Sequence, residues 1–313
     1  MTGVQTCALP ILGTPDFALP SLEVLRRRGE AVVAVVTQPD RPRGRGQHPA
    51  PPPVKVAALA VGLPVVQPEK VRHPEFLDWC RVLAPDLIVV VAFGQILPKA
   101  LLDIPRHGCI NVHASLLPRY RGAAPIQWAI IRGETETGIT TIHMDPGMDT
   151  GPILLQRRVP IAPDDTAKTL SGRLAVVGAD ALNETLDQLK AGQLHAQPQD
   201  PTQATLAPLL TKEDGHIDWR QPAAALAALV RGTNPWPGAS TTHHDEMLRI
   251  WSARVEPGAG EPGVILRADA HGVAVGTGDG RLVITELQVP GGKRLSSIEY
   301  ITGHPITPGE RLG

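Results

Sequence analysis

The sequence lacks several patterns that would mark particular classes of protein. It contains three cysteines, Cys7, Cys80 and Cys109, and their spacing fits neither a metal site nor a redox pair. We therefore expect reduced thiols, no bound metal and a cytoplasmic location. No apolar run is long enough to span a bilayer, and no charged segment precedes an apolar one near the start. We therefore expect neither a membrane anchor nor a signal peptide.

Charge and glycine spacing exclude two further classes. The formal net charge is −1, which excludes a uniformly basic nucleic-acid binder, so contacts with nucleic acid would have to use local patches. The segment Gly13-Thr14-Pro15-Asp16 lacks the G-x-G-x-x-G spacing of a dinucleotide fingerprint. We therefore do not expect NAD.

The sequence does contain a regular alternation of apolar strand-like runs and amphipathic segments. We expect strands at residues 31–36, 63–67, 86–93, 109–112, 139–143 and 153–160, and helices at 17–28, 54–61, 75–83, 124–132 and 167–190. The runs at 31–36 and 86–93 are apolar at almost every position, as parallel strands buried on both faces require. This pattern predicts an α/β fold with a doubly wound, mostly parallel, Rossmann-like sheet.

A second domain is expected after a linker, because 313 residues are enough for two domains. Residues 191–210 are rich in Gln, Pro and Thr with weak periodicity, which is typical of a linker. After a short helix at 222–230, strand-like runs with turn signals recur at 247–253, 263–267, 272–276 and 281–289. This spacing predicts a small β-barrel. The expected domains are therefore residues 1–190 and 211–313.

The first strand of the expected sheet conflicts with the sequence. A buried strand should precede Gly13, but Pro10 falls within it and cannot donate to a strand ladder. We therefore hypothesise that residues 1–12 do not carry the natural first strand. Because this strand would lie in the middle of the sheet, its loss would remove a large part of the stability of a typical domain.

Polar residues follow the strand expected at 109–112. Asn111 and His113 are two positions apart, so on a strand both side chains point to the same side. In one interpretation Asn111 caps the strand and His113 is a buried histidine with its own partners. In the other, the pair holds and protonates an oxyanion. Asp149, in a second polar turn, either serves that turn or orients His113 and favours its charged form.

Three motifs resemble one enzyme family. They are Asn111-x-His113, the run Ser115-Leu116-Leu117-Pro118-Arg119-Tyr120-Arg121-Gly122-Ala123-Ala124-Pro125 and the turn Met148-Asp149-Thr150-Gly151. Together they resemble the signature of the 10-formyltetrahydrofolate-dependent formyltransferases, and most closely the branch that acts on methionyl-tRNA. The resemblance extends from Gly13 to the C-terminus.

The resemblance implies a reaction and the residues that serve it. It implies transfer of the formyl group of 10-formyltetrahydrofolate to the α-amino group of methionyl initiator tRNA, for translation initiation, by a monomer that needs no metal. Asn111, His113 and Asp149 would be the catalytic residues. The folate would be held by Phe93, Gly94, Ile96, Leu97, Ser115, Leu116, Leu117 and Pro118.

The resemblance also bears on contacts with RNA. By composition, residues 37–47 are either a solvated surface loop or a basic segment that becomes ordered on a phosphate backbone. In the family this loop meets the tRNA acceptor stem, which implies contacts by Arg41, Arg43 and Arg45. The second domain resembles an OB fold, which often binds nucleic acid, and its expected contacts are Lys293 and Arg294.

Other functions remain open at this stage. A formyltransferase acting on glycinamide ribonucleotide usually lacks a C-terminal barrel. One acting on an amino sugar nucleotide keeps much of the central signature but not the loop Gln38-Pro39-Asp40-Arg41-Pro42. A non-catalytic RNA-binding relative is the alternative from another class. The irregular first strand keeps it open, whereas the intact Asn111, His113 and Asp149 argue against it.

Overall fold

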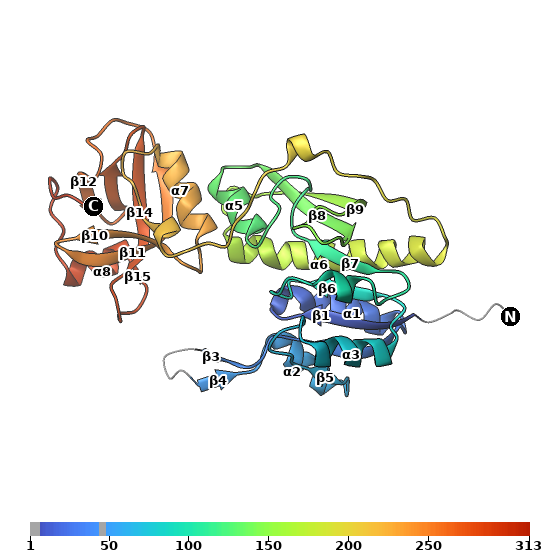
Figure 1. Ribbon diagram of the computed structural model, residues 1–313. Coiled ribbons are helices and arrows are strands. Elements are labelled where there is room, and N and C mark those ends of the chain that lie inside the picture. Colours follow the sequence, from blue (N-terminus) through green and yellow to red (C-terminus); the bar gives the residue numbers. More distant parts are fainter. Residues whose placement is uncertain (1–6, 44–47) are drawn as a thin grey trace. The chain divides into compact units, whose positions relative to one another are not determined.

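A computed structural model describes residues 7–43 and 48–313 of the chain. Contacts divide the chain into two compact units, which are described separately (Figure 1). The first comprises Met1–Ala123, Thr137–Val159 and Ser171–Ala207, and the second comprises Ala124–Glu136, Pro160–Leu170 and Pro208–Gly313. Among the residues that the structure describes, no helix combines the length and the apolar character needed to cross a membrane.

The first unit contains a seven-stranded sheet in the order β5-β2-β1-β6-β7-β8-β9. Neighbouring strands from β5 to β7 are parallel, and β8 is antiparallel to β7. The mostly parallel sheet predicted from the sequence is therefore confirmed. Its strands are β1 (Ala8–Gly13), β2 (Ala31–Val36), β5 (Val65–Val66), β6 (Ile88–Val91), β7 (Cys109–His113), β8 (Glu136–His143) and β9 (Ile153–Pro160).

Helices cover both faces of this sheet, as a doubly wound fold requires. Alternate residues of β6 are buried on opposite faces. Ile88 and Val90 join a core with Phe76 and Leu101, from helices α3 and α4. Helices α1 and α2 pack against each other and against β2. The helices of this unit are the 3₁₀ turn η1 (Asp16–Ala18), α1 (Leu19–Arg27), α2 (Pro53–Ala60), α3 (Pro74–Leu83), α4 (Lys99–Leu102), α6 (Ala167–Lys190) and the 3₁₀ turn η2 (Pro201–Gln203).

A strand forms at the position of Pro10 despite the missing donor. Strand β1 lies between β2 and β6, and its register against β2 shifts between Leu9 and Pro10. Its pairing with β6 begins only at Ile11. The backbone N–H of Ala8 is held instead by the Asp86 carboxylate, at 2.9 Å. The irregular register accommodates the proline, and the hypothesis that residues 1–12 are not the natural start stays a prediction.

The strand order reverses between β1 and β6, which makes this the point where ligands bind in open α/β sheets. The chain runs outward from β1 to β2 and β5, and then returns to β6 and β7 on the other side of β1. The loops that leave β1 and β6 are joined, because the Thr14 hydroxyl donates to the Phe93 carbonyl at 3.0 Å. Gln38, just after β2, also donates to the Phe93 carbonyl, at 3.2 Å.

Residues 41–43 and 48–50 contain regular structure that the sequence did not predict. Strands β3 (Arg41–Arg43) and β4 (His48–Ala50) form a two-stranded antiparallel sheet. The two interpretations given for residues 37–47, a solvated surface loop and a basic segment that binds phosphate, both stay predictions. Residues 44–47, which include Arg45, lie outside the described part of the chain.

The second unit is built around an antiparallel sheet in the order β10-β11-β14-β13-β12, with β15 paired to β14. The sequence predicts a small β-barrel here, and the structure confirms a C-terminal β domain built on an antiparallel sheet. Its strands are β10 (Ala239–His243), β11 (Glu246–Glu256), β12 (Ile265–Asp269), β13 (Gly272–Gly276), β14 (Arg281–Gln288) and β15 (Leu295–Ser296). Its helices are α5 (Pro125–Ile131), the 3₁₀ turn η3 (Glu213–Gly215), α7 (Ala223–Gly232) and α8 (Ser297–Gly303).

Helices α5, α7 and α8 complete the second unit. Helix α5 packs against α7, and the close approach is at Gly232, where an added Cβ would lie 2.5 Å from Cγ1 of Ile131. Helix α8 begins with a capping box, in which the Ser296 side chain and Glu299 satisfy each other's backbone N–H groups. Residues 124–136 therefore belong with the C-terminal sheet, although the sequence places them inside the first domain.

Candidate active site

Asn111 and His113 point to the same face of the sheet, as their spacing predicts. The intervening residue, Val112, points to the opposite face, where it lies against Gly178 of α6. His113 is buried, with only 6% of its side chain exposed, and Asn111 is half-buried. Both side chains meet the same carboxylate, that of Asp149. The structure therefore brings together all three residues that the sequence singles out.

Asp149 stands in the turn between β8 and β9. Its Oδ1 accepts a hydrogen bond from Nδ2 of Asn111 at 3.3 Å, and its Oδ2 lies 3.6 Å from Nδ1 of His113. Oδ2 also accepts the backbone N–H of Gly122 at 2.9 Å. The Asp149 backbone has φ 53°, in the left-handed region that non-glycine residues seldom adopt. The turn thus contains an uncommon backbone conformation, and the Asp149 carboxylate points toward the side chains of β7.

The second ring nitrogen of His113 has a protein partner. Nε2 lies 2.9 Å from the carbonyl oxygen of Tyr120, which can only accept, so we assign the hydrogen to Nε2. Nδ1 then faces the Asp149 carboxylate at 3.6 Å, which is longer than a normal hydrogen bond. Nδ1 therefore makes no hydrogen bond of normal length with this carboxylate.

The loop after β7 is fastened to the sheet by buried hydroxyl groups. The Ser115 hydroxyl donates to the carbonyl of Arg119 at 2.6 Å. The Thr140 hydroxyl of β8 donates to the Ser115 carbonyl at 2.6 Å and accepts the N–H of Leu117 at 3.1 Å. These bonds explain why a loop rich in Pro and Gly can carry Tyr120 and Gly122 to fixed places beside His113 and Asp149.

The residues predicted to hold the folate differ in how they face solvent. Phe93, Leu97, Ser115 and Leu117 are buried. Their side chains therefore support the loops, and what they can offer a ligand is backbone. Ile96 is 88% exposed, and Gly94 is exposed with φ 84°. Leu116 and Pro118 are half-buried.

Arg41, one of the predicted tRNA-binding residues, follows a residue that is anchored by hydrogen bonds. The Asp40 carboxylate accepts hydrogen bonds from Lys55 at 2.8 Å and from Gln67 at 2.9 Å. These bonds lower the pKa of Asp40, and the bond from Lys55 has the larger effect. Arg41 is exposed and lies 3.3 Å from Glu69. Gln38 and Asp40 thus hold the base of the segment, whereas Arg41 reaches outward.

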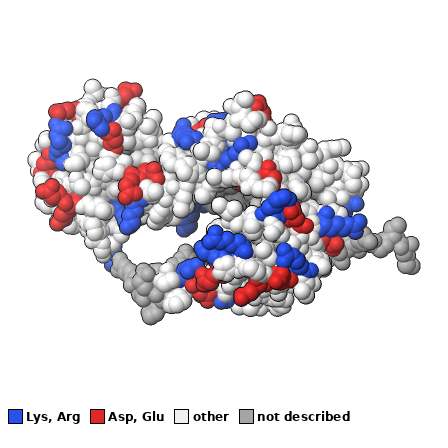
Figure 2. All heavy atoms as spheres, viewed as in Figure 1, with Lys and Arg blue, Asp and Glu red and all other residues white. Residues whose placement is uncertain are grey.

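The two predicted contacts of the second unit are in different surroundings. Lys293 is exposed. The Arg294 guanidinium lies 4.1 Å from the centre of the Trp251 ring and 3.7 Å from Glu286. Such stacking stabilises the cation by about 0.5–1 kcal/mol at an exposed site. Acidic and basic side chains are interspersed on the face drawn in Figure 2, in keeping with the net charge of −1.

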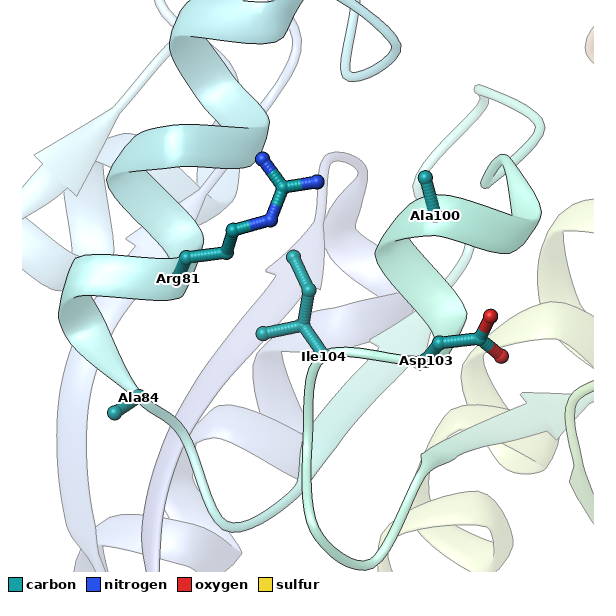
Figure 3. A pocket seen from close by; sticks show the side chains of 5 residues that line it. All are labelled: Arg81, Ala84, Ala100, Asp103 and Ile104. Carbon is teal, nitrogen blue, oxygen red and sulfur yellow. The ribbon is translucent and has the colours of Figure 1, made fainter.

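Two other features of the described residues are an open hollow and a group of side chains that could bind a metal. Neither includes Asn111, His113 or Asp149. The hollow, of about 470 Å³, is lined by Arg81, Ala84, Ala100, Asp103 and Ile104, from the ends of α3 and α4 (Figure 3). In the second unit, His243, His244 and Glu310 present ligand atoms within 4.8 Å of one another. Two of them, His243 and Glu310, are already paired at 2.9 Å.

The sequence did not indicate two side chains that hydrogen-bond to the loops of the site. Gln199, in the segment predicted to be a linker, donates to the carbonyls of Asp149 and Gly151 at 2.8 and 2.7 Å. Thr205, in the same segment, accepts the backbone N–H of Tyr120 at 2.8 Å. The only available signal was the excess of Gln and Thr at 193–205, and this composition is equally typical of a solvated linker.

Comparison with known proteins matches both parts of the chain to one family. Residues 7–186 match the family described as formyl transferase, and residues 209–305 match its C-terminal domain. A methionyl-tRNA formyltransferase of Geobacter metallireducens is 56% identical over 302 residues, which are 96% of this chain and 97% of the relative. One from Citrifermentans bemidjiense is 54% identical over 313 residues, covering 100% of this chain and 98% of the relative.

Solved structures share the fold at low sequence identity. An N-formyltransferase from Helicobacter canadensis, in complex with folinic acid and dTDP-3-aminofucose, has a TM-score of 0.68 and 17% identity, covering 93% of this chain and 100% of that one. HypX from Aquifex aeolicus, in complex with tetrahydrofolic acid, has a TM-score of 0.65 and 19% identity, covering 95% of this chain. Our chain spans 47% of the length of HypX.

Proposed function

The chain belongs to the formyl transferase family, and we propose that it transfers the formyl group of 10-formyltetrahydrofolate to the α-amino group of methionyl initiator tRNA. The observation that carries the proposal is the convergence of Asn111, His113 and Asp149 at one edge of the sheet. The choice of acceptor is supported by relatives more than half identical over nearly the whole chain, which are methionyl-tRNA formyltransferases. The reaction would serve translation initiation.

Asn111 and His113 are proposed to stabilise the charge that develops on the formyl oxygen. The Asn111 amide uses one hydrogen on Asp149, which leaves its second hydrogen for a substrate oxygen. His113 is held by the Tyr120 carbonyl at Nε2, so Nδ1 is the atom that carries a proton toward the reacting group. That proton would pass to the departing nitrogen of the folate.

Asp149 is proposed to stabilise the charged His113 and to receive the proton that the attacking amine loses. The amine must be neutral to attack, and the carboxylate lies close to both polar side chains of β7. The Gly122 N–H also donates to this carboxylate and so restrains it. The amide and the imidazole are then supplied by strand β7, and the carboxylate by the turn between β8 and β9. This mechanism gives no role to a metal.

The donor site is proposed to lie along the loops that leave β6 and β7. Phe93, Gly94, Ile96 and Leu97 belong to one loop, and Ser115, Leu116, Leu117 and Pro118 belong to the other. Support comes from the strand reversal between β1 and β6, beside which the first loop begins. Gly94 and Ile96 would offer exposed surface to the folate, and the buried members would offer backbone groups.

The tRNA is proposed to contact Arg41, Arg43 and Arg45 in the first unit and Lys293 and Arg294 in the second. Arg41 is outward-facing on an anchored segment, which suits a contact with phosphate. For the domains, we propose a catalytic part at residues 1–190, a connecting segment at 191–210 and a C-terminal part at 211–313. The family matches at 7–186 and 209–305 support this division.

We also propose that the enzyme acts as a monomer in the cytoplasm. The three cysteines are free thiols, as expected in a reducing compartment. Light scattering of the purified protein tests the oligomeric state, and a mass of two chains or more would contradict it.

The proposed reaction is tested by following formyl transfer from 10-formyltetrahydrofolate to three acceptors in parallel. These are methionyl initiator tRNA, free methionine and an amino sugar nucleotide. We expect product with the tRNA only. Product with the sugar nucleotide would favour a sugar formyltransferase, and binding of tRNA without transfer would favour a non-catalytic relative.

A further inference from the structure

Residues 199–207 contact the two loops of the first unit that carry Tyr120 and Asp149. The backbone N–H of Arg121 donates to the Thr205 carbonyl at 2.8 Å, and the N–H of Ala207 donates to the Arg121 carbonyl at 2.7 Å. The fit is close, because a Cβ on Gly122 would lie 2.7 Å from the Ala207 carbonyl oxygen. Residues 199–207, here called the strap, are therefore part of the structure around the site.

Gln199 joins the two loops that carry the site. Its Nε2 donates to the carbonyls of Asp149 and Gly151, at 2.8 and 2.7 Å. Its Oε1 accepts from Nε and Nη2 of Arg121, at 3.1 and 2.7 Å. The two hydrogens and two lone pairs of the amide are thus all used. This pattern also fixes the orientation of the amide, since a flipped one would set its oxygen against two carbonyls.

The Asp149 turn has a backbone that needs such support. Asp149 adopts φ 53°, a left-handed conformation that is less favourable for any residue other than glycine. The turn is also tight, because a Cβ at Gly151 would lie 1.9 Å from the His143 carbonyl oxygen. Hydrogen bonds from Gln199 to the carbonyls on either side of Thr150 stabilise the turn in the form that directs the carboxylate at β7.

The other end of the strap supports His113 indirectly. Tyr120 also has a left-handed backbone, with φ 62°. Its N–H donates to the Thr205 hydroxyl at 2.8 Å, and its carbonyl faces Nε2 of His113 at 2.9 Å. One segment therefore restrains both partners of the His113 ring, the Asp149 carboxylate and the Tyr120 carbonyl.

We propose that the strap is a positioning device for catalysis, with Gln199 as its central positioning residue. Gln199 holds the Asp149 turn, Thr205 holds Tyr120, and the two together set the distance between His113 and Asp149. Neither strap residue touches the three reacting side chains except through backbone groups of the loops. This inference rests on the proposed function, and it assigns a catalytic consequence to a segment that the sequence alone predicts to be a linker.

The decisive variant is Gln199→Glu, because it separates the two kinds of contact that Gln199 makes. A glutamate has the same length and can still accept from Arg121, but it cannot donate to the carbonyls of Asp149 and Gly151. Gln199→Leu removes both kinds of contact. The matched control is Gln203→Leu, since Gln203 is exposed in the same segment and, within the described part of the chain, its amide bonds only to Asp200.

We expect kcat for formyl transfer to fall about 10- to 100-fold in both Gln199 variants, the scale of a small misplacement of catalytic groups. KM for both substrates and the midpoint of thermal unfolding should stay near the wild-type values. Gln203→Leu should leave all three quantities unchanged. Wild-type kcat in Gln199→Glu would overturn the inference, and so would a loss confined to KM or accompanied by a large drop in the midpoint.

A second readout does not depend on catalysis. The N–H of Gly122 donates to the Asp149 carboxylate, so its rate of hydrogen exchange, measured by NMR, reports whether that carboxylate stays in place. We expect faster exchange in Gln199→Glu and no change in Gln203→Leu. If the wild-type protein transfers no formyl group, the proposed function fails, and this exchange rate still decides the inference. Unchanged exchange in Gln199→Glu would then reject the strap.

Discussion

At the scale of residues, the site depends on one carboxylate held from several directions. Asp149 accepts from Asn111 and Gly122 and faces His113, so its charge is directed at the two polar side chains of β7. Buried polar groups usually find partners without any chemistry, and each of these groups has a partner here. What distinguishes the arrangement is that three chemically different groups share one carboxylate, with a gap of 3.6 Å at Nδ1 of His113.

Alanine at any of these three positions should reduce turnover strongly. We expect Asn111→Ala, His113→Ala and Asp149→Ala each to lower kcat by about 100-fold or more, the scale of losing one oxyanion donor or one general acid. Steady-state kinetics with methionyl initiator tRNA measures the effect, and exposed His107→Ala is the control. Near-normal turnover of His113→Ala would remove the mechanism.

Glycine at position 122 is required by backbone and by space together. Its φ is 122°, and an added Cβ would lie 2.7 Å from the Ala207 carbonyl oxygen. We expect Gly122→Ala to lower the free energy of unfolding by about 1–3 kcal/mol, the cost of a strained backbone. Gly62→Ala is the control, because Gly62 has φ 73° with no atom within 4 Å of an added Cβ. Urea unfolding should show the smaller loss there, and equal losses would contradict the role of the strap contact.

At the scale of elements, β1 shows how a central strand tolerates a proline. The ladder shifts register at Pro10, and pairing on the β6 side starts after it. We expect Pro10→Val to raise the free energy of unfolding by about 1 kcal/mol, the usual net contribution of one hydrogen bond. Urea unfolding of the whole protein measures this change. A lower free energy of unfolding in Pro10→Val would mean that strands β2 and β6 require the shifted register of β1.

The segment that contains β3 and β4 is expected to bind tRNA. We expect Arg43→Ala to weaken tRNA binding and to reduce the slope of log K against log salt by about 0.7–0.9, as for one lost phosphate contact. Binding titrations from low to moderate salt measure both quantities. Arg27→Ala, an exposed arginine on α1 that pairs with Glu23, should change neither. An unaltered tRNA affinity and slope in Arg43→Ala would remove this element from the interface.

At the scale of the whole molecule, burial controls the reactivity of the thiols. Burial raises the pKa of Cys80 to about 11 and that of Cys109 to about 12, and it also raises the pKa of the less buried Cys7. At pH 8 the folded protein should therefore hold about one thiolate per thousand or fewer at Cys80 and Cys109. We expect a thiol reagent to modify at most Cys7 before unfolding and all three cysteines afterwards. Rapid modification of all three in the folded protein would contradict this burial.

Most of the fold could be predicted because its signals are local. The bounds expected for the strand at 31–36, the helix at 167–190 and the strand at 272–276 agree with β2, α6 and β13. Apolar periodicity over a few residues was sufficient for each. The strand β10 and the helix α8 were missed. Strand β10 is polar after its first residue, Ala239, and α8 is only seven residues long, so neither has a strong apolar pattern of its own.

The sequence by itself determined the alternation of strands and helices, the family resemblance and the shared face of Asn111 and His113. These follow from periods of two and about 3.6 residues, which nearest neighbours in the chain establish. Only the tertiary structure decided which groups stand behind the site. The bond from Gln199 to Asp149 joins residues 50 positions apart, and that from Tyr120 to Thr205 spans 85. No local pattern encodes such contacts, because they exist only once the sheet has folded and the strap has packed against its loops.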